Sequence, residues 1–370
     1  MRLTVDEVIA LVVGLAFIYA GISIAVRTFM MPGAEPALIT KLLFRATQEV
    51  FNVVSVRMRA DRRRQDLIGL FAPVALLVVL FFTIALMGVG YAFVFHAVGA
   101  GGFNESVNFS ASAISTLGFA ELPLGSFVLT MLTVFEAMSS AAVISLLIGY
   151  LPNLYSDYTT REQTIAKLMA EVDDGTSGPT IVAAFQQSPG LDQTGDVWSD
   201  WADWFTRIGA GHSSITSALF IRSPAAPVSW VSVAGAVLDA CSLLLSTAAV
   251  DDATRRQATR CLSSGAKALD KIATRLGSPT PGPDATWPEQ PISVTEAEFD
   301  AAVDALARAG VEVAADRAAA WTAFARNRVR YDRALLDLCR ANLLTEGTWS
   351  GDRPSAKHLL RMPIWRAGKL

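Results

Sequence analysis

The chain has 370 residues, of which 52% are hydrophobic and only 18% are charged, and its mean hydropathy is +0.39. Soluble domains carry about 25% charged residues, so this composition argues against an ordinary soluble enzyme. The 31 Lys and Arg residues and the 34 Asp and Glu residues give a formal net charge of −3. That balance lacks the broad basic surface that nucleic acid binding requires, and we expect no nucleic acid partner.

Three apolar segments are long enough to cross a membrane. Val8 to Val26 is free of charge, and Leu67 to Val98 carries no Asp, Glu, Lys or Arg. As a helix, the second segment would be about 48 Å long, against a hydrocarbon core of about 30 Å. The third segment, Phe127 to Leu151, is interrupted only by Glu136. We predict three membrane-spanning helices.

The basic residues predict how these helices are oriented. The segment between the first two spans holds Arg27, Lys41, Arg45, Arg57, Arg59, Arg62, Arg63 and Arg64, whereas residues 99–126 hold no Lys or Arg. Short cytoplasmic loops collect Lys and Arg, so the first segment is predicted inside and the second outside. The N-terminus then faces out, and everything after Pro152 is cytoplasmic.

Two further segments indicate contact with membrane lipid. Ala37 to Met58 mixes apolar and basic positions in a pattern that suits a helix lying in the interface. A soluble helix packed on the C-terminal domain is the alternative. The tail from Lys357 to Lys369 is basic and apolar, which suits an anionic inner leaflet or a neighbouring subunit.

The segment between the second and third spans, Phe103 to Phe127, is rich in hydroxyl groups and contains no cation. Asn104 or Ser106 can cap a helix that has Glu105 in its first turn, and Val107 to Ser115 would extend roughly 14 Å. A helix of that length cannot cross a bilayer. We predict a re-entrant helix buried in protein, because lipid offers no partner for the irregular backbone that follows.

The residues after this helix, Ser115 to Leu122, read STLGFAEL and are followed by Pro123. They resemble the selectivity filter of potassium channels, whose usual form is Thr-Thr-Val-Gly-Tyr-Gly-Asp-Leu followed by Pro. In this resemblance the matched positions are Thr116 for the threonine, Leu117 for the valine, Gly118 for the first glycine, Phe119 for the aromatic residue and Glu121 for the carboxylate. Ala120 stands where the second glycine is expected. Gly149 to Gln163 and Ala210 to Ala240 are also similar to actinobacterial membrane proteins classed as small ion channels with one pore loop.

Ion chemistry explains these residue types. Potassium filters replace the water around K⁺ with stacked rings of backbone carbonyl oxygens and the threonine hydroxyl. A regular strand alternates its carbonyls, so some filter residues must adopt positive φ, where glycine has no steric penalty. The short helix directs its negative C-terminal end toward the cavity, which favours a cation. A packed membrane hairpin without a pore is the alternative.

One pore loop cannot enclose an ion, so the resemblance implies a homotetramer. Phe127 to Leu151 would line the inner pore, and its small residues Ala137, Ser139, Ser140, Ala141 and Ala142 permit close helix packing. Glu136 is a costly carboxylate within a span and is expected to face protein or water. It either supports the filter from behind or lines the cavity, and Glu121 is a second expected support of the filter.

The domain organisation follows from these elements. Residues 1–66 form an N-terminal transmembrane helix and a basic interfacial segment, residues 67–154 form the pore module, and residues 155–370 form a helical cytoplasmic domain. Helices are predicted at Thr160 to Val172, Val197 to Ile208, Val228 to Val250, Asp252 to Leu276, Val294 to Arg308 and Val311 to Leu344. A linker rich in Pro and Gly, Ser278 to Pro291, is predicted to divide the domain.

Polar and aromatic residues of this domain fit a packed core better than an active site. Trp198, Trp201 and Trp204 share one helical face, a spacing typical of a core. His212, Arg222 and Asp239 form either a polar pocket or a satisfied buried network. Cys241, Cys261 and Cys339 form no Cys-x-x-Cys pair, and we predict reduced, buried thiols. No nucleophile, base and orienting group occur together, so an enzyme is not expected.

These observations predict an all-α membrane protein that consists of a pore-loop channel module, an extra N-terminal transmembrane helix and a helical cytoplasmic domain. The expected function is a tetrameric channel in the plasma membrane, of the bacterial inner-membrane type, that conducts K⁺. The permeant ion is the only expected cofactor, and the domain leaves room for an unidentified cytoplasmic regulator. A channel-like sensor or scaffold that does not conduct is the alternative.

Overall fold

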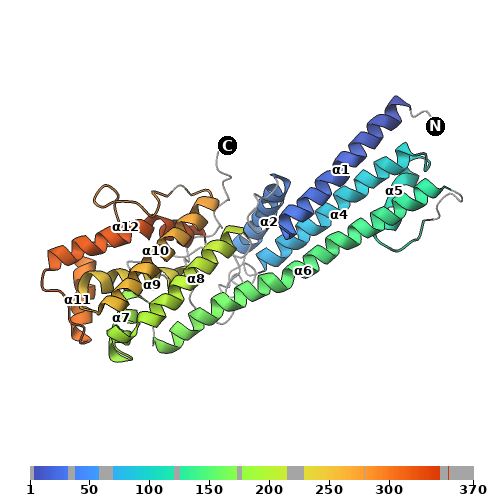
Figure 1. The fold of residues 1–370 in the computed structure, drawn as a ribbon. Helices are drawn as coiled ribbons and strands as arrows, with labels where there is room; N and C mark the ends of the chain where they lie inside the picture. Colours follow the sequence, from blue (N-terminus) through green and yellow to red (C-terminus); the bar gives the residue numbers. More distant parts are fainter. Residues whose placement is uncertain are drawn as a thin grey trace. The chain divides into compact units, whose positions relative to one another are not determined.

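The structure is a computed structural model that describes residues 4–31, 38–57, 70–120, 126–172, 177–214, 229–278, 280–341 and 349. The regular elements of these residues are all helices, and one isolated antiparallel bridge joins Ala248 to Val313 (Figure 1). The chain divides into two compact units. Met1–Thr47 with Ala72–Ser156 forms the first, and Gln48–Phe71 with Asp157–Leu370 forms the second.

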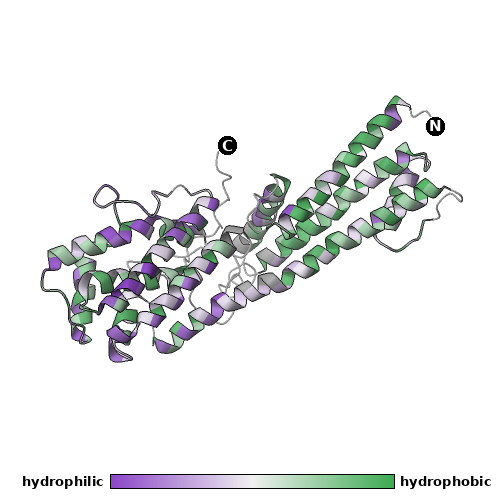
Figure 2. Cartoon of the chain, in the orientation of Figure 1, coloured by the Kyte–Doolittle hydropathy of each residue, from purple (hydrophilic) through white to green (hydrophobic). Residues whose placement is uncertain are grey.

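Four described helices are long and apolar enough to cross a membrane: Val5–Phe29, Pro73–Ala97, Phe127–Pro152 and Trp230–Thr247. The first three belong to α1 (Val5–Phe29), α4 (Phe71–Ala97) and α6 (Phe127–Glu171), so the predicted apolar helices are confirmed. Figure 2 shows α1 and α4 as hydrophobic along almost their whole length, whereas α6 becomes more polar in its second half. Helices of this length and composition indicate a membrane protein.

Helix α1 packs closely against α4 through two glycines. A Cβ atom at Gly14 would lie 2.6 Å from the carbonyl oxygen of Gly90, and a Cβ atom at Gly90 would lie 2.8 Å from that of Gly14. Beside them the rings of Phe17 and Phe93 meet edge to face, with centroids 6.2 Å apart. Small residues let two backbones approach closely in lipid, where van der Waals packing drives helix association. The glycines therefore fix α1 against α4.

Helix α6 is a single element of 45 residues that contains Pro152. The sequence predicted separate helices at Phe127 to Leu151 and Thr160 to Val172, but the residues between them are also helical. Its buried positions in the first unit form one stripe, Leu129, Glu136, Ser140, Val143 and Leu147. The opposite face is exposed and includes Val134, Met138, Ala141, Ser145 and Gly149. One face of the apolar part of α6 is therefore not covered by the described residues.

Helix α2 (Leu38–Arg57) occupies the segment predicted as an interfacial helix. Leu38 and Leu42 are exposed, whereas Thr47 and Phe51 are buried. The ring of Phe51 meets that of Phe71 edge to face, with centroids 5.7 Å apart. The exposed leucines leave an apolar face of the helix without cover from the described residues.

The second unit contains α7 (Gly178–Gln187), the short 3-10 helix η1 (Leu191–Gln193), α8 (Gly195–Ser214), α9 (Trp230–Thr247), α10 (Asp252–Arg275), α11 (Glu296–Arg308) and α12 (Arg317–Ala341). Its centre is α9, the fourth helix of membrane-spanning length, of which 89% is buried in this unit. A helix that is hydrophobic on all sides is either a membrane span or a core helix. Enclosure by α7, α10 and α12 makes α9 a core helix.

The core confirms several expectations about buried side chains. Trp198, Trp201 and Trp204 are almost completely buried in one hydrophobic cluster. All three cysteines are free and buried. Packing of the indole rings against their neighbours thus explains the three-residue spacing without a ligand.

Two expectations about this unit are wrong. The segment Ser278 to Pro291 does not divide the domain, because residues on both sides of it share one hydrophobic core. The last helix begins at Arg317 rather than Val311, because Ala314 donates its N–H to the carbonyl oxygen of Thr247, at 2.7 Å, and extends the chain there. The sequence analysis also missed α7. The C-terminal tail, including residues 357–369, lies outside the described residues.

Candidate functional site

The candidate site begins with a short helix, α5 (Phe103–Ile114), in the first unit. Its 12 residues correspond to about 18 Å, too short to cross a bilayer. Gly102 is its N-cap and donates its N–H to the Glu105 carboxylate at 3.0 Å. The helix therefore starts before the predicted caps, Asn104 and Ser106, while Glu105 does lie in its first turn.

Buried serines connect α5 to the two longer helices. The hydroxyl of Ser110 lies 2.7 Å from the carbonyl oxygen of Gly88 in α4 and 2.5 Å from Glu136 Oε1 in α6. The Glu136 side chain is fully buried. Its carboxyl group lies against α5, on the side of α6 that faces its own chain. A carboxyl group in an apolar span requires such a polar partner.

The chain reverses direction after α5 in an unusual backbone conformation. Thr116 has φ of 58° and is the only non-glycine residue with positive φ among the described residues, and Gly118 has φ of 64°. Such a conformation costs about 1–2 kcal/mol for a residue with a Cβ atom. The turn is held by the Thr116 N–H, which donates to Ala113 O at 3.0 Å, and by the Gly118 N–H, which donates to Ser112 O at 3.3 Å.

Ser112 is a site residue that the sequence analysis missed. Its side chain is buried, and its hydroxyl accepts the N–H of Ala120 at 2.9 Å. Because its carbonyl oxygen also accepts the Gly118 N–H, one residue of α5 holds the loop at two points. A serine in the last turn of a short helix was the only available sequence signal, and it does not specify a partner eight positions further along.

Ala120 does not adopt the glycine-like conformation that the resemblance to a potassium filter implies for its position. Positive φ is found at Thr116 and Gly118 but not at Ala120. The Ala120 N–H instead donates a hydrogen bond to the Ser112 hydroxyl. The left-handed backbone of Thr116 and Gly118 is therefore not repeated at Ala120. Glu121 lies outside the described residues.

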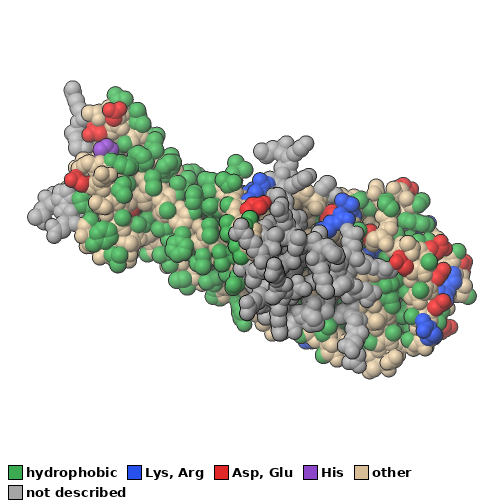
Figure 3. Space-filling model, turned by 180° about the vertical axis from the view of Figure 1, so that it is seen from behind, with side chains coloured by type: hydrophobic (Ala, Val, Ile, Leu, Met, Phe, Trp, Pro, Cys, Tyr) green, Lys and Arg blue, Asp and Glu red, His purple; other side chains and the backbone are tan. Residues whose placement is uncertain are grey.

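The loop exposes unused carbonyl groups and apolar side chains. In the described structure no hydrogen bond is donated to the carbonyl oxygens of Thr116, Leu117, Gly118 or Phe119. Leu117 and Phe119 are 74% and 60% exposed. Figure 3 shows the unit that contains this loop with a mostly hydrophobic surface. Consecutive carbonyl oxygens without donors fit the ligand set that K⁺ prefers.

The second unit contains a buried ionic network around Asp239, one of the three residues predicted to form either a polar pocket or a buried network. Asp239 accepts hydrogen bonds from Arg328 and from the Tyr331 hydroxyl, the latter at 2.9 Å. Arg222 and the side chain of His212 lie outside the described residues. Burial lowers the pKa of Arg328, but the carboxylates of Asp239 and Asp332 reverse this effect and raise that pKa well above its usual value.

Comparison with known proteins adds no assignment: no family model, curated protein or solved structure matches the chain. Among the described residues, no group of His, Cys, Asp and Glu side chains could hold a metal ion. The function is therefore inferred from the geometry of the loop and its surroundings.

Proposed function

We propose that this protein is a homotetrameric potassium channel whose filter is formed by Thr116, Leu117, Gly118, Phe119 and Ala120. The carbonyl oxygens of the loop would coordinate K⁺, and the Thr116 hydroxyl would add the innermost ring. Glu136 would support the loop through Ser110 and α5. The proposal includes no other cofactor and no enzymatic activity.

The observation that supports this proposal most is the positive φ at Thr116 and Gly118 with Leu117 between them. Alternation between left-handed and right-handed residues turns successive carbonyls toward one side, whereas an extended strand alternates them. Strained residues cluster at functional sites, and the strained Thr116 is exposed. The conformation follows the short helix α5, as a filter requires.

The exposed half of α6 supports assembly around a shared axis. Ala141, Ser145 and Gly149 are small residues on this exposed face, and a Cβ atom at Gly149 would meet no atom within 4 Å. Small residues permit close approach of neighbouring helices in lipid. One loop per chain cannot surround an ion, so four copies would place their loops and α6 helices around one pore.

The proposed topology follows from the charge distribution. Basic residues occur between α1 and α4 but not between α4 and α6, a distribution that favours an inner position for the first of these segments. The second unit would then be cytoplasmic in a bacterial plasma membrane and would offer a surface for a regulator. A cysteine introduced at Ala120 should react with an impermeant maleimide from outside; labelling from the cytoplasmic side alone would contradict this topology.

Flux into liposomes tests the pore. Purified protein should carry K⁺ and discriminate against Na⁺, and Gly118→Ala should abolish the current because its φ of 64° is unfavourable for alanine. Gly102→Ala is a matched control, because Gly102 precedes the same helix with φ of −63° and has open space for a Cβ atom. Native mass spectrometry should show tetramers.

A non-conducting sensor or scaffold is the second candidate, and Ala120 is the observation that favours it. Loss of the second glycine-like residue removes part of the repeated carbonyl pattern. If tetramers form but neither the wild type nor Ala120→Gly carries ions in planar bilayers, the protein is a non-conducting sensor or scaffold. Conduction by the wild type would exclude it.

A further inference from the structure

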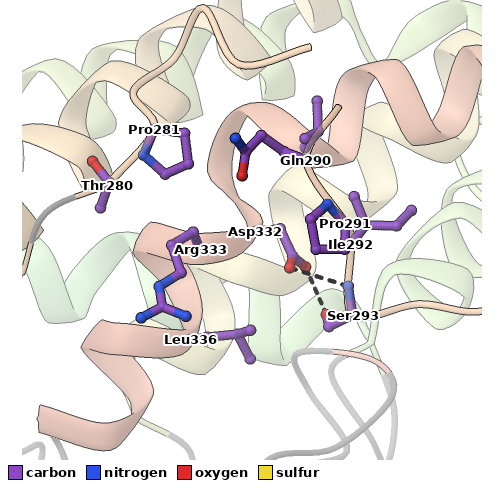
Figure 4. A pocket seen from close by; sticks show the side chains of 10 residues that line it. Thr280, Pro281, Gln290, Pro291, Ile292, Ser293, Asp332, Arg333 and Leu336 are labelled. Carbon is purple, nitrogen blue, oxygen red and sulfur yellow. Dashed lines mark hydrogen bonds between the residues drawn. The ribbon is translucent and has the colours of Figure 1, made fainter. Parts of the chain in front are cut away.

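The second unit has a cavity that the proposed pore does not use. It has a volume of about 510 Å³ and lies between α12 and residues 280–293 (Figure 4). Its lining residues are Thr280, Pro281, Gln290, Pro291, Ile292, Ser293, Val329, Asp332, Arg333 and Leu336. Small-molecule sites typically have volumes of about 300–1,000 Å³, combining apolar walls with a few oriented polar groups.

Hydrogen bonds preform the rim of this cavity. The Thr280 hydroxyl donates to Asp270 in α10. The Arg330 Nε atom in α12 donates to the carbonyl oxygen of Pro283 at 3.1 Å. These two bonds attach the proline-containing segment to helices on both sides, so little ordering is required when a ligand enters.

A buried carboxylate forms one side of the cavity. Asp332 is only 4% exposed, and its Oδ1 atom accepts Arg328 Nε at 2.7 Å and the Ser293 hydroxyl at 2.6 Å. Its Oδ2 atom accepts the Ser293 N–H at 3.1 Å. A carboxylate oxygen can accept two hydrogen bonds, so Oδ2 retains capacity for another donor.

The charge of Asp332 favours a cationic donor. Asp332 shares the Arg328 guanidinium with a second buried carboxylate, that of Asp239. A hydrogen bond to a carboxylate is roughly twice as strong when the donor is also charged. An ammonium group is therefore the favoured donor to Asp332 Oδ2.

An arginine on the same helix supplies the opposite charge. Arg333 lines the cavity next to Asp332, and its side chain is 53% exposed. Its Nε atom donates to Asp337 at 3.2 Å, and Asp337 also accepts from Arg340 at 3.3 Å. The terminal nitrogens of Arg333 make no hydrogen bond to the described residues and remain available for a carboxylate.

We propose that this cavity binds a small zwitterion, namely a free amino acid with an apolar side chain. Its ammonium group donates to Asp332, its carboxylate accepts from Arg333, and its side chain contacts Pro281, Pro291 and Leu336. This inference goes beyond the proposed pore, since the cavity lies in the other unit and binding is measured without ion flux.

Isothermal titration calorimetry on the full-length protein in detergent tests the proposal. We expect L-leucine or L-phenylalanine to bind. The analogues 4-methylpentanoate, which lacks the amine of leucine, and 3-methylbutylamine, which lacks its carboxylate, should each bind at least ~10-fold more weakly. Absence of binding by both amino acids at about 10 mM would overturn the proposal. Binding of either analogue with the same affinity as L-leucine would also overturn the proposal.

Matched arginine substitutions test the site itself. Arg333→Gln should weaken amino acid binding at least ~10-fold, because a charge-assisted hydrogen bond is lost. Arg317→Gln is the control, because Arg317 is also an ion-paired, partly exposed residue of α12 but does not line the cavity. Leu336→Trp should block binding by filling the cavity. Unchanged affinity in both Arg333→Gln and Leu336→Trp would contradict the proposed site.

Discussion

At the scale of single residues, the loop after α5 depends on a serine and a threonine rather than on its glycine alone. Thr116 holds a left-handed conformation that disfavours any residue with a Cβ atom. Ser112 compensates by accepting two backbone N–H groups, those of Gly118 and Ala120. The strain and the hydrogen bonds that maintain it therefore lie within a few residues of each other.

Replacing Ser112 should loosen the proposed filter. Ser112→Ala removes the acceptor for the Ala120 N–H, which is worth about 1 kcal/mol, so we expect a lower potassium to sodium permeability ratio. Reversal potentials in mixed K⁺ and Na⁺ measure this ratio. Ser115→Ala is the control, because that hydroxyl also bonds to Ser112 O but does not touch Ala120. Equal reversal potentials in the wild type and Ser112→Ala would argue against a role for the bond.

Replacing Ala120 should have the opposite effect. Ala120 does not adopt positive φ, so the outermost ring of carbonyls is expected to be missing and the inner residues to act alone. Glycine would reach the left-handed conformation without the cost of about 1–2 kcal/mol that alanine would incur, so Ala120→Gly should restore this ring and raise the potassium to sodium permeability ratio. An unchanged reversal potential in Ala120→Gly would show that this residue does not limit selectivity.

At the scale of helices, the length of an apolar helix does not decide which neighbours it packs against. Both α4 and α9 are long and apolar, yet α9 is enclosed in the second unit while α4 packs against α1 and α5. α6 buries one stripe against its own chain and leaves the other exposed. Close contacts between helices therefore depend on individual small or polar residues, such as Gly14 and Ser110.

The glycine contact between α1 and α4 predicts a local loss of stability. Gly14→Val would place a Cβ atom 2.6 Å from the backbone oxygen of Gly90, which cannot move without shifting α4. Such overpacking costs about 1–3 kcal/mol, so the variant should melt at a lower temperature in detergent. Val12→Leu, at an exposed position of α1, is the control. A melting temperature equal to that of the control would contradict this packing.

At the scale of the whole molecule, one helix belongs to both compact units. α6 is continuous from Phe127 to Glu171, and the unit boundary falls between Ser156 and Asp157. A continuous helix transmits displacement of either end. In the proposed channel, a change in the second unit could therefore alter the inner end of the pore while the filter stays unchanged.

Truncation after Glu171 tests this division of roles. Removal of α7 to α12 should preserve tetramers and the reversal potential, because α5, α6 and the loop remain. The open probability should change, since the inner end of α6 loses its attachment to the second unit. Native mass spectrometry and single-channel recording measure both properties. A shifted reversal potential would place part of the selectivity outside the loop.

Local properties of the sequence determined the helical, membrane-type character of this protein. Whether a segment can cross a membrane depends on its length and charge, so three apolar helices and the short α5 could be predicted from residues close together in the chain. The buried tryptophans and cysteines followed from the same local reasoning. The exact ends of the helices could not be predicted as well. Asn104 and Ser106 were the predicted N-caps of α5, but Gly102 is the N-cap and bonds to Glu105.

Only the tertiary structure decided which residues meet. Asp239 pairs with Arg328, 89 positions away in the chain, and Ser110 meets Glu136, 26 positions away. The tertiary structure also placed α9 in a core, whereas its apolar composition fits either a core helix or a membrane span. Periodicity encodes which face of a helix is apolar, whereas the partner of a buried polar group is chosen by packing between distant segments, where an unpaired group would be costly.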